Sequence, residues 1–211
     1  MSDVEQRLAN VYGATSVSEL SKTYDDWAAH YDSDMLSVGY AHPATMVGLV
    51  ARYLIDLNAP ILDAGVGTGT IGTLLHILNY TNLHGIDMSQ GMLAQAKARG
   101  VYRALGQAVL GEALDFASGQ FSCIISTGTF TTGHAPASAF DELTRLLTPG
   151  GILIFTVGEA FWAQAGFAQK LAGLCAQGRL RPVWATEPYR PMPHSKTESH
   201  FLARAHVYQR V

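Results

Sequence analysis

The sequence carries little charge, and its basic residues do not gather in one stretch. Charged residues make up 15% of the 211 residues, and the formal net charge is −3. Proteins that bind nucleic acid by electrostatic attraction usually present a cluster of Lys and Arg. We therefore expect no nucleic-acid partner, although a small contact of the tRNA type stays compatible with this composition.

Long apolar runs are absent as well. Gly, Asp or Thr interrupts each apolar segment well before the length of about 18 residues that a membrane-spanning helix needs. The first residues, Met-Ser-Asp-Val-Glu-Gln-Arg, are polar and resemble neither a signal peptide nor a transit peptide. We expect a cytoplasmic protein without a membrane partner.

The sequence also lacks the residues of a disulfide framework or a metal site. Its two cysteines, Cys123 and Cys175, are far apart, and its eight histidines are scattered without ligand spacing. We expect reduced thiols and no bound metal. Hydrophobic residues, at 48%, suffice for a core, and the length suits a single domain over residues 1–211.

Strand-like and helix-like segments alternate at short intervals beyond residue 40. The strand-like segments are 61–64, 83–87, 102–105, 121–126 and 152–157, and the helix-like segments are 41–57, 70–78, 90–99 and 137–147. This alternation predicts an α/β fold, a Rossmann-like three-layer sandwich around a mostly parallel sheet. Ligands of such sheets bind at the carboxyl ends of the strands.

Further segments flank this core, which we place at 41–157. Residues 1–35 read as helical, and residues 1–40 are expected to form an N-terminal helical lid. Beyond Val157, a helix-like segment at 161–177 and a strand-like alternation at 201–211 predict a C-terminal part, 158–211. A sixth and a seventh strand, the last antiparallel, would complete a seven-stranded sheet.

Glycines cluster directly after the first strand, in Asp63-Ala-Gly65-Val-Gly67-Thr-Gly69. Glycine lets the backbone turn sharply and approach a ligand, and the following helix offers free N–H groups. Two registers compete. Gly67 to Gly72 matches the dinucleotide fingerprint G-x-G-x-x-G, whereas the register from Asp63 to Gly69 places a carboxylate that repels pyrophosphate and attracts an ammonium group. We favour the second register, because its glycines begin at the strand end.

Asp87 ends the second strand, 24 residues after Asp63. A carboxylate at this position can accept both hydroxyls of an adenosine ribose, and the neighbouring Met88 is deformable enough to pack on an adenine edge. Alternatively, Asp87 caps the helix that begins near Ser89. With the glycine loop before it, we favour the ribose interpretation.

Together these residues resemble the class I S-adenosylmethionine-dependent methyltransferase family, over about residues 20–157. The glycine loop is similar to the family's first motif, residues 86–93 (Ile-Asp-Met-Ser-Gln-Gly-Met-Leu) to its second, and residues 146–153 (Leu-Leu-Thr-Pro-Gly-Gly-Ile-Leu) to its fifth-strand turn. Residues 24–32 are similar to the ubiquinone-biosynthesis-like and Williams–Beuren-region-like branches, and residues 128–136 to the latter.

The resemblance implies that the cofactor is S-adenosyl-L-methionine and assigns its contacts. Adenine would lie on residues 108–112, where Val109 stands in place of the Asp of many relatives, so that backbone N–H groups near Leu110, or the Glu112 side chain, would serve instead. The other cofactor-binding residues that we predict are Tyr24, Trp27, Tyr31, Asp63, Gly65, Gly67, Gly69, Asp87, Met88 and Thr127.

Aromatic residues recur at helical spacing near the N-terminus. Tyr24, Trp27 and Tyr31 would share one face of a helix. This face either packs into the core or forms a lid whose rings stabilise the sulfonium cation, and the acidic residues beside it, Asp32 and Asp34, could be solvated. A substrate pocket would draw on Tyr40, Trp162, Trp184, Tyr189, Met192 and His194, and Thr127, Thr129, Thr131 and Thr132 could position a polar substrate.

His134 follows the fourth strand and is either a catalytic base or a plain loop residue. The favoured function is methyl transfer to N, O, S or C of a small molecule, one candidate being an imidazole or thiol metabolite as in thiohistidine biosynthesis. The alternatives are a nicotinamide-dependent oxidoreductase, for which no Tyr-x-x-x-Lys pair is recognisable, and a non-catalytic module that binds the cofactor. The oligomeric state stays open.

Overall fold

A computed structural model describes residues 3–131 and 133–211, which contain a seven-stranded sheet in the order β3-β2-β1-β4-β5-β7-β6. Strands β1 to β5 pair in parallel, whereas β7 runs antiparallel to both β5 and β6. The predicted Rossmann-like sheet with an antiparallel last strand is confirmed. The strands are β1 (Ile61–Ala64), β2 (Leu83–Asp87), β3 (Ala104–Gln107), β4 (Phe121–Phe130), β5 (Leu147–Gly158), β6 (Leu180–Ala185) and β7 (Ala203–Arg210).

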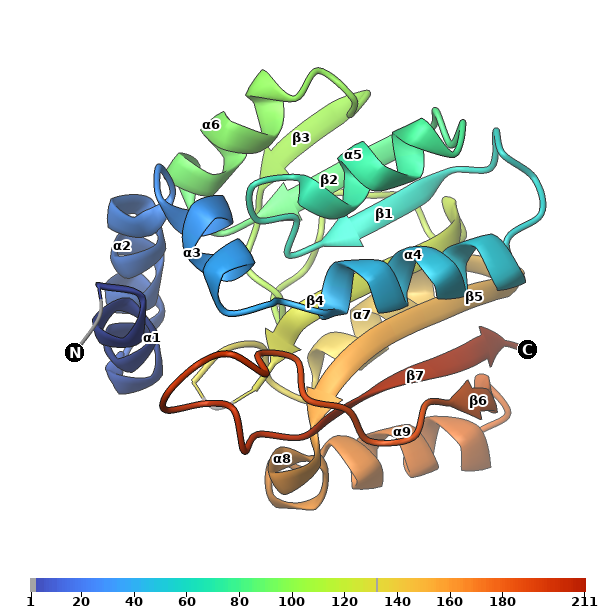
Figure 1. Cartoon of the computed structure of the whole chain (residues 1–211). Helices are drawn as coiled ribbons and strands as arrows, with labels where there is room; N and C mark the ends of the chain where they lie inside the picture. Colours follow the sequence, from blue (N-terminus) through green and yellow to red (C-terminus); the bar gives the residue numbers. More distant parts are fainter. Residues whose placement is uncertain (1–2, 132) are drawn as a thin grey trace.

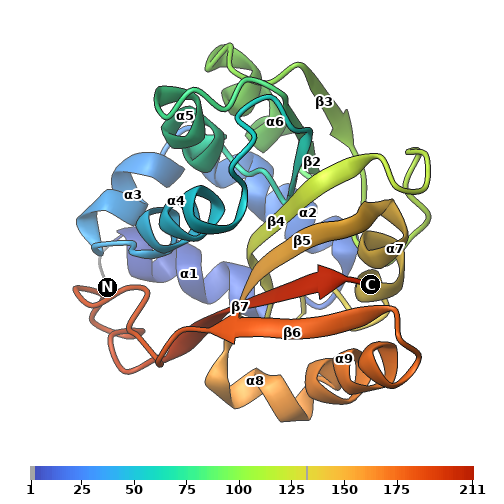
Figure 2. The same ribbon diagram turned by 90° about the vertical axis from the view of Figure 1, so that its right-hand side faces the viewer.

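Helices cover both faces of the sheet (Figures 1 and 2). One face carries α4 (His42–Tyr53), α5 (Thr70–Ile77) and α6 (Gln90–Ala98), and the other carries α7 (Ala139–Leu146) and α9 (Phe167–Ala176), with the short α8 (Glu159–Gln164) leading into α9. A sheet covered on both faces needs strands without polar alternation. The central strands meet this need, since all four residues of β1 are buried and most of β5 is too.

Three helices precede this core: α1 (Asp3–Gly13), α2 (Val17–Trp27) and α3 (Tyr31–Ser37). Ser16 begins α2, because its side chain accepts a hydrogen bond from the Glu19 N–H, while the Glu19 carboxylate reaches back to the Thr15 N–H. The chain turns again before Tyr31, which therefore starts a separate helix. The prediction that Tyr24, Trp27 and Tyr31 share one helix face is wrong, although their rings do come together.

Other boundaries differ from the predicted ones for local reasons. The expected helix at 161–177 divides at Gly166, whose φ of +75° is the left-handed conformation that ends one helix and precedes the next. Strand β3 lies two residues further along the chain than predicted, and β5 begins at Leu147, before the Pro149-Gly150 turn, rather than after it.

Membrane spans, metal sites and disulfides are described here for residues 3–131 and 133–211. There, no helix is both long and apolar enough to cross a membrane. Within 3–131 and 133–211, no group of three His, Cys, Asp or Glu side chains is arranged to hold a metal ion. Cys123 is buried and Cys175 half-buried, and neither is in a disulfide.

Candidate active site

A cavity of about 350 Å³ lies at the carboxyl edge of the sheet, between the strand ends and the N-terminal helices α1 to α3. Figure 1 shows β1 and β2 pointing toward these helices. This size falls in the range of small-molecule sites. The predicted site residues that line the cavity are Tyr24, Trp27, Tyr31, Gly65, Gly67, Asp87, Met88, Val109, Leu110, Thr127 and His134. Asp63 and Gly69 lie behind its wall.

The glycine loop depends on left-handed backbone at Gly65, Gly67 and Gly69, whose φ angles are +86°, +54° and +82°. A Cβ at Gly65 would stand 2.2 Å from Cγ2 of Thr129, so the loop and the end of β4 touch only because Gly65 has no side chain. A Cβ at Gly67 would meet no atom within 4 Å, because this residue faces the cavity. The loop is thus shaped for backbone contact with a ligand.

Asp87 fixes this loop from the end of β2. Its Oδ2 accepts a hydrogen bond of 2.8 Å from the Gly67 N–H, and its Oδ1 one of 2.9 Å from the Ser89 N–H. The cap of α6 is Ser89 itself, whose hydroxyl accepts from the Met92 N–H. Burial raises the pKa of the Asp87 carboxyl, and the amide donors partly offset this rise. Since each carboxylate oxygen can accept a further hydrogen bond, Asp87 remains able to bind a diol in the cavity.

Asp63 is buried behind the loop, where the Tyr102 hydroxyl donates a 2.8 Å hydrogen bond to its Oδ2. Burial raises the pKa of Asp63 to about 7, Tyr102 lowers it and the neighbouring Asp87 raises it. The Tyr102 oxygen also accepts from the Gly72 N–H and stands 2.1 Å from where a Gly72 Cβ would be. Gly72 therefore makes room for Tyr102 rather than for a pyrophosphate, which argues against the dinucleotide register.

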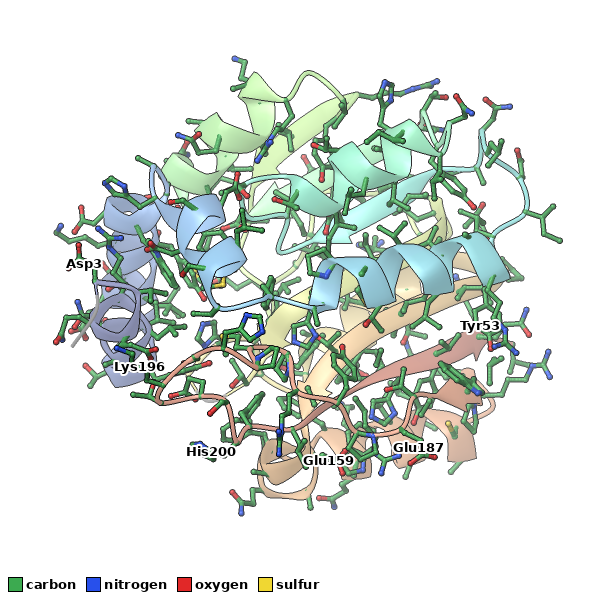
Figure 3. All side chains as sticks on the ribbon, viewed as in Figure 1. Asp3, Tyr53, Glu159, Glu187, Lys196 and His200 are labelled. Atoms are coloured by element: carbon green, nitrogen blue, oxygen red, sulfur yellow. The ribbon has the colours of Figure 1, made fainter. Side chains whose placement is uncertain are left out.

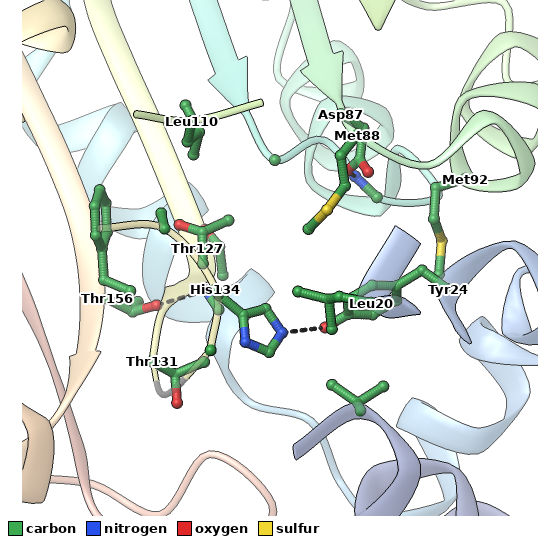
Figure 4. Close-up of a pocket in the computed structure, with 18 of the residues that line it drawn as sticks. Leu20, Tyr24, Asp87, Met88, Met92, Leu110, Thr127, Thr131, His134 and Thr156 are labelled. Atoms are coloured by element: carbon green, nitrogen blue, oxygen red, sulfur yellow. Dashed lines mark hydrogen bonds between the residues drawn. The ribbon is translucent and has the colours of Figure 1, made fainter. Parts of the chain in front are cut away.

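The end of β4 contributes Thr127 to the cavity wall. Thr127 Oγ1 is buried and has no hydrogen-bond partner among the described residues. The next residue, Gly128, has its N–H bonded to Oγ1 of Thr156 on β5. A buried hydroxyl without a partner carries an energetic cost. Because this oxygen is buried, other atoms of Thr127 form the cavity wall. Figure 4 shows Thr127 across the cavity from Asp87 and Met88. Of the other threonines that we predicted here, Thr132 lies outside the described residues.

Aromatic side chains from α2 and α3 close the cavity opposite the glycine loop. Tyr24 and Trp27 stack with ring centroids 6.2 Å apart, and Tyr31 meets Trp27 edge-on at 4.9 Å. The Tyr24 hydroxyl lies 2.9 Å from Nε2 of His134, a hydrogen bond that joins the lid to the loop after β4 (Figure 4). Burial raises the pKa of Tyr24 well above its ordinary value, so the hydroxyl stays protonated.

Carboxylates on α2 and α3 attach these helices to the rest of the chain. Asp25 accepts hydrogen bonds from the Ser89 hydroxyl at 2.6 Å and the Gly91 N–H at 2.7 Å, which seats α2 on the start of α6. Asp32, which we expected could be solvated, accepts from Thr68 Oγ1 of the glycine loop. Asp34 likewise accepts from the Trp27 indole N–H at 2.8 Å.

A second attachment joins α1 to the segment between β6 and β7. The buried Glu5 carboxylate accepts hydrogen bonds from the hydroxyls of Ser195 and Thr197 and, at 2.7 Å, from the Lys196 N–H. Figure 3 shows Lys196 beside α1. This segment supplies Pro191, Met192 and Phe201 to the cavity wall. Of the predicted substrate residues, Tyr40 and Met192 line the cavity, whereas Trp162, Trp184, Tyr189 and His194 do not.

The amino-acid sequence of this chain is similar to those of known methyltransferases. Residues 62–155 match the family described as "Methyltransferase domain". The human methyltransferase-like protein 27 is 33% identical over 157 residues, which cover 73% of this chain and 64% of that protein. The uncharacterised methyltransferase YodH of Bacillus subtilis is 34% identical over 128 residues, covering 57% of this chain and 53% of YodH. The chain thus spans less than two thirds of the length of either relative.

Solved structures share the fold at low sequence identity. A chain of the complex between the Haloferax volcanii Trm112 methyltransferase activator and a methyltransferase has a TM-score of 0.64 at 17% identity, over 87% of this chain and 96% of that one. Geranyl diphosphate C-methyltransferase from Streptomyces coelicolor, in complex with Mg²⁺, geranyl diphosphate and S-adenosyl-L-homocysteine, has a TM-score of 0.60 at 15% identity, over 95% of this chain and 87% of that one.

Proposed function

We propose that this chain is a class I S-adenosylmethionine-dependent methyltransferase and that it methylates a small molecule in the cavity at the carboxyl edge of the sheet. The methyltransferase domain match over residues 62–155 and the shared fold support this proposal. The cofactor of this family is S-adenosylmethionine. The observation that carries the proposal is the continuity of one cavity from the glycine loop to the ends of β4 and β5. Cofactor and acceptor can therefore lie in contact within the same cavity.

We call the lining residues of the glycine loop, the end of β2 and the loop 108–112 the cofactor cradle. These residues fit this cofactor. The backbone of Gly65 and Gly67 would face the methionine part, the Asp87 carboxylate would accept the ribose hydroxyls, and Met88 with Val109 and Leu110 would pack on adenine. Val109 brings no acidic group to the adenine amino nitrogen, so backbone groups of this loop would serve instead. Thr127 lines the same cavity. When bound, the cofactor supplies an electrophilic methyl group on a sulfonium.

The chain's own residues align the reactants and manage the proton. The aromatic rings of Tyr24, Trp27 and Tyr31 stabilise a positive charge in the cavity. A lone pair of the acceptor would form the new bond to the methyl carbon while the carbon–sulfur bond breaks and leaves its electrons on sulfur. We assign His134 to receive the proton that the acceptor loses. Much of the rate comes from holding the reactants in line.

The small-molecule nature of the acceptor rests on the volume of the cavity, about 350 Å³, and on the low positive charge of the chain. Resemblance of residues 24–32 and 128–136 to particular family branches underlies one candidate class, the imidazole and thiol metabolites. Both groups are nucleophiles that lose a proton on methylation, which suits a histidine at the end of β4.

Calorimetry with S-adenosylhomocysteine, followed by transfer of labelled methyl to a panel of small acceptors, tests the proposal. We expect His134→Gln to bind S-adenosylhomocysteine like the native chain and to transfer methyl about 10²-fold more slowly. The matched control is His76→Gln, at an exposed histidine on α5. Absence of binding heat refutes the proposal, and binding without transfer to any acceptor favours a non-catalytic module.

A further inference from the structure

One part of the cavity lies away from the cofactor cradle, over the ends of β4 and β5. We call it the acceptor chamber and define it by five lining residues: Tyr40, His42, Val157, Met192 and Phe201. Figure 4 shows Thr156, which precedes Val157 on β5, on the opposite side of the cavity from Asp87 and Met88. Phe201 packs against the end of β5, where a Cβ at Gly158 would stand 2.3 Å from its ring. The chamber is therefore walled mainly by rings and apolar side chains.

His42 is the buried polar group of this chamber. It is 5% exposed, at the start of α4, and its Nδ1 lies 2.6 Å from the Tyr189 hydroxyl. Its Nε2 makes no hydrogen bond with a described residue, although the ring lines the cavity. Burial lowers the pKa of His42 to about 3, so the imidazole is neutral at physiological pH. Nε2 is not among the buried unpaired side-chain atoms of the described residues, so it reaches the open space of the cavity and is available to a ligand there.

Tyr40 places a second neutral polar atom near the end of β4. Its hydroxyl lies 3.0 Å from where a Cβ at Gly128 would stand, directly after Thr127 on the strand. The ring of Tyr40 contacts His42 edge-on, with centroids 5.2 Å apart. Burial raises the pKa of Tyr40 well above its ordinary value, so its hydroxyl carries no charge.

The charged side chains among the described lining residues are both carboxylates, Asp87 and Glu112, and both stand on the cofactor side. An anionic acceptor would lose its hydration on entering and would meet this negative charge with no Lys or Arg among the described lining residues to offset it. A neutral ring would lose little hydration and would gain contact with the aromatic wall.

We propose that the methyl acceptor is an uncharged aromatic or heteroaromatic molecule, whose polar edge is bound by Nε2 of His42 and the hydroxyl of Tyr40. This inference rests on the methyl-transfer function proposed above and narrows its substrate class. It admits neutral imidazoles and aromatic thiols, and it excludes acceptors that present a carboxylate or phosphate to the chamber.

Pairs of compounds that differ by one carboxylate test the charge requirement. The probes are phenol against 4-hydroxybenzoate, and benzimidazole against benzimidazole-5-carboxylate. Binding is measured by ligand-detected NMR on the chain saturated with S-adenosylhomocysteine. We expect the neutral members to bind at least tenfold more tightly. Equal or tighter binding of the carboxylates, or no binding of any neutral probe, overturns the inference. Failure of S-adenosylhomocysteine itself to bind would instead refute the proposed function.

Variants of the two polar residues test their assignment. His42→Phe and Tyr40→Phe each remove one polar contact and keep a ring, and each should weaken binding of the best neutral probe about fivefold, the effect of one hydrogen bond. Tyr189→Phe is the matched control, because it breaks the same internal hydrogen bond as His42→Phe but leaves Nε2 in the chamber. An unchanged affinity for S-adenosylhomocysteine in each variant shows that the variant is still folded. Native probe affinity in both His42→Phe and Tyr40→Phe, or equal losses in His42→Phe and Tyr189→Phe, overturns the assignment.

Discussion

Replacing Gly67 with alanine should weaken cofactor binding much more than it weakens the fold. Gly67 has a φ of +54°, and an added Cβ would meet no protein atom within 4 Å. The new methyl group would project into the cavity beside the N–H that Asp87 holds at 2.8 Å. It therefore occupies space that a ligand uses when it packs on the loop backbone.

The cost to the fold comes from the backbone alone. A non-glycine residue in the left-handed region loses about 1–2 kcal/mol, and the reduced freedom of the unfolded chain returns about 0.4–1 kcal/mol. The net loss of about 1 kcal/mol corresponds to a fall of about 2–4 °C in the melting temperature for a chain of this length. Gly100→Ala is the matched control, since Gly100 has a φ of +68°, meets nothing within 4 Å and lies outside the cavity.

Differential scanning calorimetry and isothermal titration with S-adenosylhomocysteine separate the two effects. Both variants should show a similar fall in melting temperature, whereas only Gly67→Ala should bind at least tenfold more weakly, about 1.4 kcal/mol. Native affinity in Gly67→Ala would refute the placement of the cofactor on this loop. Weakened affinity in Gly100→Ala would show that backbone strain alone disturbs the site.

Three further outcomes follow from contacts described above. Asp87→Asn keeps one carbonyl oxygen for the amides of Gly67 and Ser89, so S-adenosylhomocysteine affinity should fall at least tenfold in calorimetry; native affinity would remove Asp87 from the site. Glu5→Ala leaves three donors unpaired and should lower the free energy of unfolding by about 1–3 kcal/mol and speed cleavage within α1 by a protease; unchanged values would show that α1 is held by packing alone. Burial and Arg204 lower the pKa of His206 to about 4. The unfolded chain therefore binds more protons below pH 6.5, and the free energy of unfolding falls by up to about 3 kcal/mol as the pH drops from 6.5 to 4. Denaturant unfolding should show a flatter pH dependence in His206→Phe, and an unaltered slope would contradict this origin.

The fold and the cradle could be predicted because both depend on local sequence. The alternation of short apolar runs and helical segments suffices to indicate a parallel sheet, and the conformation that Gly65, Gly67 and Gly69 must adopt is a property of those residues themselves. Asp87 is the last residue of its strand, so its place at the sheet edge was also predictable. Which ligand atoms it contacts stays a prediction.

The lid could be predicted only in outline. Spacing predicts that Tyr24, Trp27 and Tyr31 share one helix face, but it does not reveal the turn that separates Trp27 from Tyr31. The three rings nevertheless pack in one cluster. The contacts of Asp25 with α6 and of His42 with Tyr189 join segments 64 and 147 residues apart. A single sequence carries no signal for such pairs, because a lone Asp or His looks the same whether it is solvated or buried.

Strand β7 follows β6 in the chain but lies between β5 and β6 in the sheet. During synthesis, β6 emerges with no neighbour to pair with, and it joins the sheet only when Ala203–Arg210 becomes available to bridge it to β5. The cavity wall is completed late for the same reason. Glu5 in the first helix can form its hydrogen bonds only when partners 190 to 192 residues later have been synthesised. Contacts of such long range slow folding, because the loop must close before they form. The nascent chain therefore exposes the edges of β5 and β6 until late, and this is the stage at which we expect it to depend most on protection from aggregation.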